Sequence, residues 1–278
     1  MLIGHTYLNS AEDSMNANLR VIVCLLTAVP WFWFDSKARG QTREDTDVEK
    51  MTTEAGVSES VATPIPNASE QIVAATNQFR EQQGLSPVEV DPNLQAAAKY
   101  FAKYMARTHT YGHTADGQRP SERAKQHGYD YCIVAENIAY AYSSLGYEPR
   151  ELAERFVTGW KESPKHRENM LDPDVTQTGV AVAQGGKSGY YFAVQMFGRP
   201  ESQRIEFRVV NRSDQELMYE IDDREFPLGP RYIRTHQRCR PTTLVLASDQ
   251  QDSRKFEPKR GETLVIEQVD GEIQVQVE

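Results

Sequence analysis

Apolar residues recur at helical spacing in four stretches between residues 69 and 162. In the first stretch Ile72, Ala75 and Phe79 fall on one face, and Gly84 stands where a helix C-cap is expected. Proline suits the first turn of a helix, and the other three predicted helices begin at Pro92, Pro120 and Pro149. The first of these follows Asp91, which is predicted to be its N-cap. The imidazoles of His109 and His127 are predicted to mark helix ends.

Two strands are predicted after the fourth helix. We expect one strand at 178–183 and a second at 190–197, joined at Gly185 and Gly186. Helices and strands that share one core in this order form an α+β domain.

From Arg204 onward the apolar period changes to two, as the apolar residues around Phe207 and Tyr219 show. Near the end, Asp270 and Gly271 are the two-residue signal of a β-hairpin. This turn places Leu264 opposite Val277, Ile266 opposite Val275 and Gln268 opposite Ile273, so that the apolar members share one face. The sequence therefore predicts a small all-β module, either a sandwich or a barrel.

An apolar run from Val21 to Phe34 follows Arg20 near the N-terminus. It is too short for a comfortable membrane span of about 20 residues. It suits the core of a secretory signal peptide, with Ser36-Lys37-Ala38 as the cleavage site; an uncleaved N-terminal anchor is the alternative. We therefore predict a signal peptide or anchor at 1–38, a flexible linker at 39–68, an α+β domain at 69–200 and a β-rich module at 201–278. The mature chain is expected to be secreted or held at the cell envelope.

Charge and missing motifs exclude several classes of function. The net charge of -9 argues against general nucleic-acid binding, which needs a basic surface. The sequence contains no C-x-x-C pair, zinc-finger spacing, phosphate-binding P-loop or G-x-S-x-G nucleophile elbow. We therefore expect no nucleic-acid partner, and contact with a membrane only through an uncleaved N-terminal segment.

Three short polar motifs carry the candidate chemistry. They contain His113 at 111–114, Glu136 at 135–139 and His166 at 163–171. Two imidazoles and a carboxylate from distant segments are the groups that make a divalent cation site or an acid/base pair. The alternative is that these groups only hydrogen bond to one another and tie their segments together.

Taken in order, these motifs resemble the CAP superfamily (SCP/PR-1-like domain) in its bacterial branch, over about residues 72–197. The Gly-His-Thr around His113 resembles the first histidine segment of the family, and Ala-Glu-Asn-Ile around Glu136 is similar to its Gly-Glu-Asn-Ile/Leu motif. Trp160, followed by Ser-Pro-Lys-His-Arg, resembles its Trp…Ser-Pro-Gly-His-Arg segment. The resemblance implies an α-β-α sandwich.

In the family, two histidines and two glutamates line a central cleft and can hold a divalent metal. The resemblance carries three of these positions over to His113, Glu136 and His166, whereas the fourth falls on Ser163. Three ligands would hold Zn²⁺ or another divalent cation weakly and leave a position open to water. The same three residues are the candidate catalytic groups if the protein is an enzyme.

Two functions follow from these residues. The first is an exported protein that binds a lipid, a glycan or a protein at the cell envelope or outside the cell. The second is a metal-dependent hydrolase that acts on peptides or cell-wall material. We favour the binding protein, because no nucleophile has a base near it in sequence and the fourth family ligand is missing. A third hypothesis is a purely structural domain targeted by the β-rich module.

Four further sets of residues leave alternatives open. Cys132 and Cys239 either form a disulfide that joins the two domains, as an exported protein allows, or are two unrelated thiols. Gln195 either reaches the cleft or lies in the core or on the surface. The basic residues near Cys239 form either an anion-binding loop or a solvated one; they are Arg231, Arg234, His236, Arg238 and Arg240. A set of tyrosines either lines a binding site or belongs to the core; these are Tyr140, Tyr142, Tyr147, Tyr190 and Tyr191.

Overall fold

The computed structural model of the chain describes residues 49–50, 62–246, 253–269 and 271–278. The predicted signal peptide or anchor at 1–38 lies outside the described residues. No helix in the described part of the chain is long and apolar enough to cross a membrane.

A mostly antiparallel sheet forms the centre of the α+β domain. Its long strands are β5 (Tyr131–Tyr142), β6 (Gln177–Gly185) and β7 (Tyr190–Pro200), in the order β6-β7-β5. Two short strands, β2 (Ala62–Pro64) and β3 (Glu89–Val90), pair with the other edge of β6. A separate pair consists of β1 (Glu49–Lys50) and β4 (Thr110–Tyr111).

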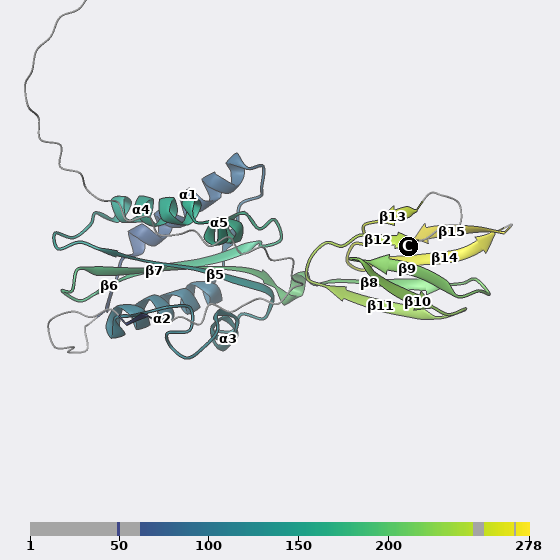
Figure 1. Cartoon of the computed structure of the whole chain (residues 1–278), viewed down its shortest axis with the longest axis horizontal. Coiled ribbons are helices and arrows are strands. Elements are labelled where there is room, and N and C mark those ends of the chain that lie inside the picture. The colour runs from purple at the N-terminus through teal and green to yellow at the C-terminus, as the bar shows by residue number, and fades with distance from the viewer. Residues whose placement is uncertain (1–48, 51–61, 247–252, 270) are drawn as a thin grey trace, which may run out of the picture. The chain divides into compact units, whose positions relative to one another are not determined.

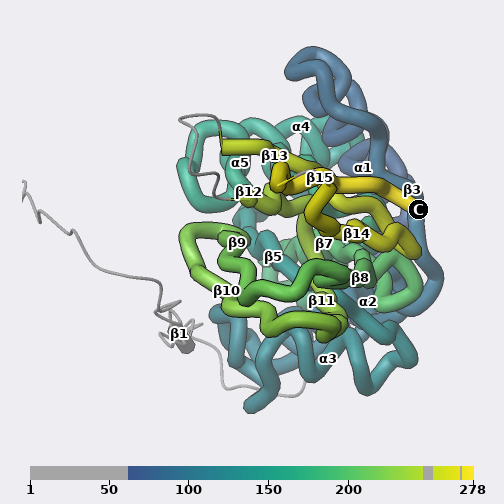
Figure 2. The backbone as a smooth tube through the Cα atoms, turned by 90° about the vertical axis from the view of Figure 1, so that its right-hand side faces the viewer, coloured from purple at the N-terminus to yellow at the C-terminus, as the bar shows by residue number. Residues whose placement is uncertain are grey.

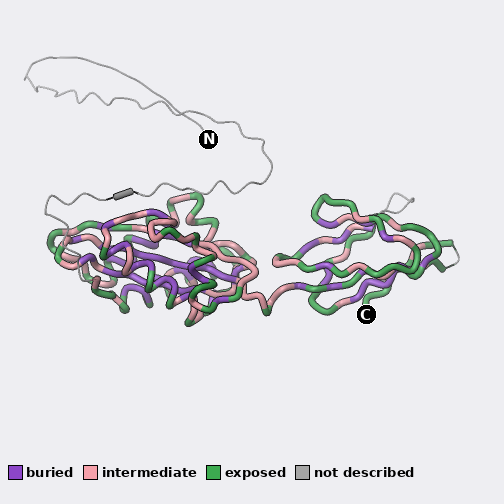
Figure 3. The backbone as a smooth tube through the Cα atoms, turned by 90° about the horizontal axis from the view of Figure 1, so that it is seen from below, coloured by how far each residue is buried: buried purple, intermediate pink, exposed green. Residues whose placement is uncertain are grey.

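Helices cover both faces of this sheet (Figure 1). One face carries α1 (Pro66–Gln82), α4 (Pro149–Glu162) and α5 (Pro164–Leu171), and the other carries α2 (Pro92–Thr108) and α3 (Pro120–Gln126). Side chains of β7 alternate between the two layers, so that Ala193 and Phe197 pack under the first group and Val194 and Met196 under the second. Figure 3 shows that these central strands are buried. The predicted α+β class and the α-β-α sandwich are confirmed.

The helix ends lie close to where the local sequence predicts them. Asp91 caps α2, because its Oδ1 accepts hydrogen bonds from the backbone N–H groups of Asn93 and Leu94 at 2.8 and 3.0 Å. Gly84 follows α1 with a φ of +73°, a left-handed conformation that costs glycine little. His109 and His127 are the C-cap residues of α2 and α3, as predicted.

Three elements differ from the prediction. Strand β5 covers the segment around Glu136, for which no helix or strand was predicted, and helix α5 was not predicted either. The domain also begins earlier than residue 69, so the predicted linker ends before β2. The backbone N–H of Ile65 donates to the C=O of Val182 at 2.9 Å, and this contact joins segments that are distant in sequence. No local pattern reveals such a partner.

The C-terminal module consists of two four-stranded sheets, drawn in green to yellow in Figure 2. A short 3-10 helix, η1 (Glu201–Gln203), precedes it. The first sheet has the order β11-β8-β14-β15 and contains β8 (Ile205–Asn211), β11 (Ile233–Arg238), β14 (Thr263–Val269) and β15 (Glu272–Val277). The second has the order β10-β9-β12-β13 and contains β9 (Leu217–Ile221), β10 (Arg224–Leu228), β12 (Leu244–Leu246) and β13 (Arg254–Phe256).

Both sheets contribute to one apolar core. Of the two predicted forms, sandwich and barrel, the module is therefore a sandwich. The predicted hairpin register is confirmed as well. In the β14–β15 pair, Leu264 lies opposite Val277, Ile266 opposite Val275 and Gln268 opposite Ile273. The turn residue at 270 lies outside the described residues.

His236 lies inside this sandwich with only 4% of its surface exposed. Its Nε2 is hydrogen bonded to the Tyr219 hydroxyl at 2.8 Å, and its ring stacks on Phe207. Burial, together with the positive charges of Arg238 and Arg234, lowers the pKa of His236 to about 4. The imidazole is therefore neutral in the folded protein at neutral pH.

We expect this histidine to make the protein less stable in acid. The unfolded chain takes up the proton near pH 6.5 and the folded chain only near pH 4, so the stabilising contribution of His236 is complete above pH 6.5 and is lost as the pH falls to 4. The shift corresponds to about 3 kcal/mol. Urea unfolding at about pH 7 and about pH 4.5 should show a smaller pH dependence for His236→Gln than for the wild type. Equal pH dependence of the two proteins would contradict this expectation.

The two cysteines of the described chain form a disulfide. Cys132 and Cys239 have an S–S distance of 1.94 Å and a Cα–Cα distance of 5.2 Å. The adjacent Arg240 forms ion pairs with Asp172 at 2.7 Å and with Asp174 at 2.6 Å. A covalent bond and a charged cluster therefore link the sandwich to the α+β domain.

The basic cluster around Cys239 is mostly paired with carboxylates. Besides Arg240, Arg231 forms an ion pair with Asp214 at 2.7 Å, and Arg238 lies 3.6 Å from Asp222. The guanidinium of Arg234 lies over an aromatic ring, that of Phe226. These cations have partners within the same molecule. The contacts therefore favour neither an anion-binding loop nor a solvated one.

Candidate functional site

Glu136 lies on β5 with its side chain 1% exposed, and a buried arginine holds it. Arg123 of α3 donates from Nη2 to Glu136 Oε2 at 3.0 Å and from Nη1 to Asp116 Oδ1 at 2.6 Å. The same Nη2 donates to the backbone C=O of His113 at 2.9 Å, and the guanidinium lies over the Phe101 ring. Buried charges need such partners. One arginine thus fixes the positions of both His113 and Glu136.

His113 contacts the other oxygen of the same carboxylate. Its Nδ1 lies 2.8 Å from Glu136 Oε1, and its side chain is 31% exposed. A carboxylate accepts hydrogen bonds, so this contact places the proton of a neutral imidazole on Nδ1 and leaves Nε2 as the nitrogen that can bind a ligand.

His166 lies in the first turn of α5 and is held in a similar way. Its Nδ1 is 2.9 Å from Ser163 Oγ. Two amides connect this helix to β5, since Asn137 Nδ2 donates to the His166 C=O at 3.1 Å and Asn169 Nδ2 donates to Asn137 Oδ1 at 2.9 Å. The asparagine next to Glu136 therefore ties the helix that carries His166 to strand β5.

The pKa of His166 is lowered, first by burial and then by the positive charges of His113 and Lys165. A lowered pKa keeps the His166 ring neutral near neutral pH, and only a neutral imidazole can act as a ligand or a base.

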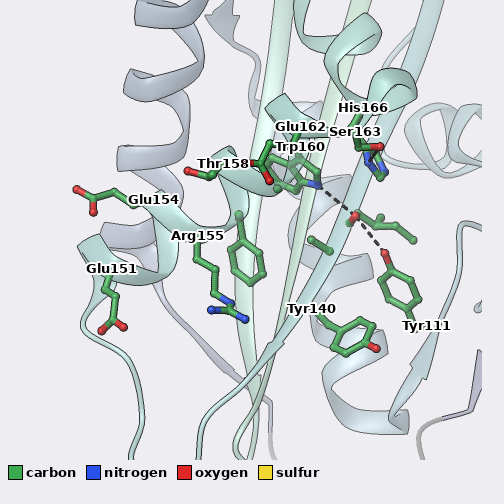
Figure 4. Close-up of a pocket in the computed structure, with 14 residues that line it drawn as sticks. Tyr111, Tyr140, Glu151, Glu154, Arg155, Thr158, Trp160, Glu162, Ser163 and His166 are labelled. Atoms are coloured by element: carbon green, nitrogen blue, oxygen red, sulfur yellow. Dashed lines mark hydrogen bonds between the residues drawn. The ribbon is translucent and has the colours of Figure 1, made fainter. Parts of the chain in front are cut away.

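A groove of about 720 Å³ opens beside His166 (Figure 4). Helix α4 forms one wall and Tyr111 and Tyr140 lie on the other side, with β5 between them. The indole Nε1 of Trp160 and the hydroxyl of Tyr111 both donate to the C=O of Ile138, each at 3.1 Å. The charged residues of the groove are Glu151, Glu154, Arg155 and Glu162. His113 and Glu136 are not among the residues that line it.

In the described part of the chain, no three His, Cys, Asp or Glu side chains are arranged to hold one metal ion. Both oxygens of Glu136 are engaged, by His113 and by Arg123. The cation site predicted from His113, Glu136 and His166 therefore stays a prediction, and their catalytic role stays one as well.

Other residues in the sequence analysis separate into core and groove. Gln195 is buried and donates to Thr76 Oγ1 at 2.9 Å, so it belongs to the core. Tyr191 is also in the core, whereas Tyr140 and Tyr142 are 45% and 54% exposed. The roles of Arg123 and Asp116 were not predicted. The signal for Arg123 was a charge beside Ala124 on the inner face of a short helix, where an apolar residue is usual.

Comparison with known proteins agrees with this arrangement. The sequence model of the cysteine-rich secretory protein family (CAP) matches residues 73–197. The uncharacterised protein YkwD of Bacillus subtilis is 29% identical over 117 residues, which are 42% of this chain and 42% of YkwD. An uncharacterised protein of Borreliella burgdorferi is 26% identical over 102 residues, which are 37% of this chain and 60% of that protein. The matches therefore span about half the length of these relatives.

Among solved structures, an outer surface protein from Borrelia burgdorferi shares 22% identity with a TM-score of 0.44, over 50% of this chain and 99% of that one. An extracellular protein from Bacillus anthracis that contains an SCP domain shares 24% identity with a TM-score of 0.39, over 48% of this chain and 41% of that one. The match to the family covers the motifs around His113, Glu136 and His166. Residues 73–197 of this chain are a CAP domain.

Proposed function

We propose that this chain is an exported binding protein whose CAP domain takes a ligand at the cell envelope, or outside the cell, in the groove beside His166. The groove itself carries this proposal. Its volume of about 720 Å³ lies within the range of about 300–1,000 Å³ that is usual for ligand sites. Aromatic rings and charged groups both line it, which suits a lipid, a glycan or a protein segment.

Two observations support export. The sequence of residues 20–38 has the features of a secretory signal. The bond between Cys132 and Cys239 belongs in an oxidising compartment, because disulfides rarely persist in the cytosol.

We also propose that His113 and His166 hold a divalent cation weakly. Each Nδ1 is engaged by a second group, Glu136 or Ser163, as is usual for imidazoles whose other nitrogen binds a metal. Two imidazole nitrogens suit Zn²⁺ or a similar ion and leave positions for water or ligand. When bound, the cation would act as a Lewis acid toward a ligand oxygen. In this proposal Glu136 orients His113 and does not bind the cation itself.

Calorimetric titration with Zn²⁺ tests the cation site. We expect weak binding that is lost in His113→Ala and in His166→Ala, and that weakens further as the pH is lowered, because protonated imidazoles do not bind metals. Glu136→Gln should weaken binding by about 10–100-fold through the orientation of His113. His127→Ala, at the end of α3, is the control and should bind like the wild type. Unchanged affinity in both alanine variants would place any cation elsewhere.

The same preparations test the groove and the alternative function. Lipid or glycan that copurifies with the protein, identified by mass spectrometry, would support the binding protein. Hydrolysis of peptides or cell-wall fragments that requires Zn²⁺ and disappears in His166→Ala would favour the hydrolase instead.

A further inference from the structure

The outer edge of strand β5 faces the groove. Within the described residues β5 is the last strand of its sheet and pairs with β7 alone. Alternate residues of an antiparallel strand turn both N–H and C=O away from the partner. The C=O of Ile138 faces outward, since Trp160 and Tyr111 donate to it. The C=O of Glu136 does so as well, because Asn169 Nδ2 donates to it at 3.3 Å.

The next outward position along the strand is Tyr140. Beyond it the hydroxyl of Tyr147 donates to the C=O of Tyr142 at 2.8 Å and covers that end of the strand. Within the described residues no hydrogen bond covers the outward N–H or C=O of Tyr140. Proteins usually protect such an edge, because its free groups can pair with another strand.

Side chains of two kinds flank this uncovered position. Toward α4 stand three carboxylates and two guanidinium groups, since Arg150 forms an ion pair with Glu154, and this leaves an excess of one carboxylate; they are Glu151, Glu154, Glu162, Arg150 and Arg155. On the opposite face of the sheet lie the exposed rings of Tyr140 and Tyr142, and Leu145 in the following loop is 98% exposed. The edge therefore has an acidic side and an apolar, aromatic side.

We propose that the β5 edge at Tyr140 accepts an extended polypeptide segment by strand addition. Successive side chains of a strand point to opposite faces, so the favoured segment alternates basic residues, which meet the carboxylates of α4, with apolar ones, which meet Tyr140 and Tyr142. The peptide pairs with the N–H and C=O of Tyr140, because the outward C=O groups of Ile138 and Tyr142 already accept hydrogen bonds from side chains. This inference rests on the proposed function because it uses the same groove, but it does not need the cation.

The test uses a labelled eight-residue peptide that alternates lysine and valine, measured by fluorescence anisotropy with the full chain. Two further peptides carry N-methyl groups on every second residue, one on the lysines and one on the valines. Each keeps the side chains and charge but loses the hydrogen-bond donors of one edge. We expect one of the two to bind at least about tenfold more weakly than the parent. A peptide with glutamate in place of lysine should also bind more weakly.

Protein variants provide a matched pair. Tyr140→Pro removes the outward N–H, which an edge strand tolerates, and Tyr140→Ala removes the ring but keeps the N–H. We expect Tyr140→Pro to bind the peptide about tenfold more weakly than Tyr140→Ala. His113→Ala and His166→Ala should keep peptide binding and lose Zn²⁺ binding. The two variants therefore distinguish failure of the proposed cation site from failure of the proposed peptide site.

Equal affinity for both methylated peptides would overturn the proposal, since binding would then depend on charge alone. That comparison uses the wild-type protein and holds even where Tyr140→Pro does not fold. Equal affinity of a folded Tyr140→Pro and Tyr140→Ala would overturn it as well.

Discussion

We expect Arg123→Met to lower the free energy of unfolding of the CAP domain by about 3–5 kcal/mol. The guanidinium is fully buried and is the ion-pair partner of Asp116 and Glu136, whose side chains are 0% and 1% exposed. Methionine fills a similar volume but leaves two buried carboxylates without their cation, and unpaired buried charge is the costly state. Chemical denaturation followed by far-UV circular dichroism measures the loss. Zn²⁺ binding should fall in the same variant, because Arg123 also holds the His113 backbone.

Arg150→Met is the matched control. That side chain is 82% exposed in its i,i+4 pair with Glu154, and such surface pairs contribute roughly 0.3–0.5 kcal/mol. If the Arg123→Met protein were as stable as the Arg150→Met protein, the buried ion pairs of Arg123 would contribute nothing to the free energy of unfolding.

Removing the disulfide by Cys132→Ser with Cys239→Ser will lower the free energy of unfolding by about 4–5 kcal/mol. The two cysteines are 107 residues apart in sequence. A cross-link restricts the unfolded chain more when it closes a longer loop. Urea unfolding of the oxidised wild type and of the serine variant measures the difference, and a count of free thiols in the denatured protein verifies the bond.

Arg240→Ala tests the charged contacts next to this disulfide. Arg240 is 51% exposed, so its loss from the oxidised protein should cost about 1 kcal/mol or less. One set of unfolding curves can thus rank the loss of the disulfide against the loss of the Arg240 side chain by their effect on the free energy of unfolding. The same unfolding midpoint for oxidised and reduced wild type would contradict the expected role of the disulfide.

Elements that depend on local contacts were predictable from the sequence. The Asp91 cap, the predicted prolines at the start of three helices and the glycines beyond two helix ends act within a few residues of themselves. The same holds for the hairpin of β14 and β15, where a two-residue turn sets the register of every pair.

Strand β5 was not predictable in this way. Its residues show no clean alternation, because both faces of the strand are covered and Glu136 and Asn137 are buried in its middle. Its partner β7 begins 48 residues after β5 ends, at Tyr190 after Tyr142. Strands that are so far apart in sequence pair only when the rest of the domain has brought them together. The same holds for the pairing of β2 with β6 and for the free edge at Tyr140.

The sequence by itself determined the fold class, the helix ends, the C-terminal hairpin and the three motifs that contain His113, Glu136 and His166, because each of these is written in short patterns or in resemblance to a family. Only the tertiary structure decided which groups meet: Arg123 with Glu136 and Asp116, Asn169 with Asn137, and Cys132 with Cys239. The physical reason is that a buried charge or amide requires a partner, and a thiol can take one in an oxidising compartment, but none of these groups specifies which partner it is. The packing of helices on the sheet brings one particular partner within reach.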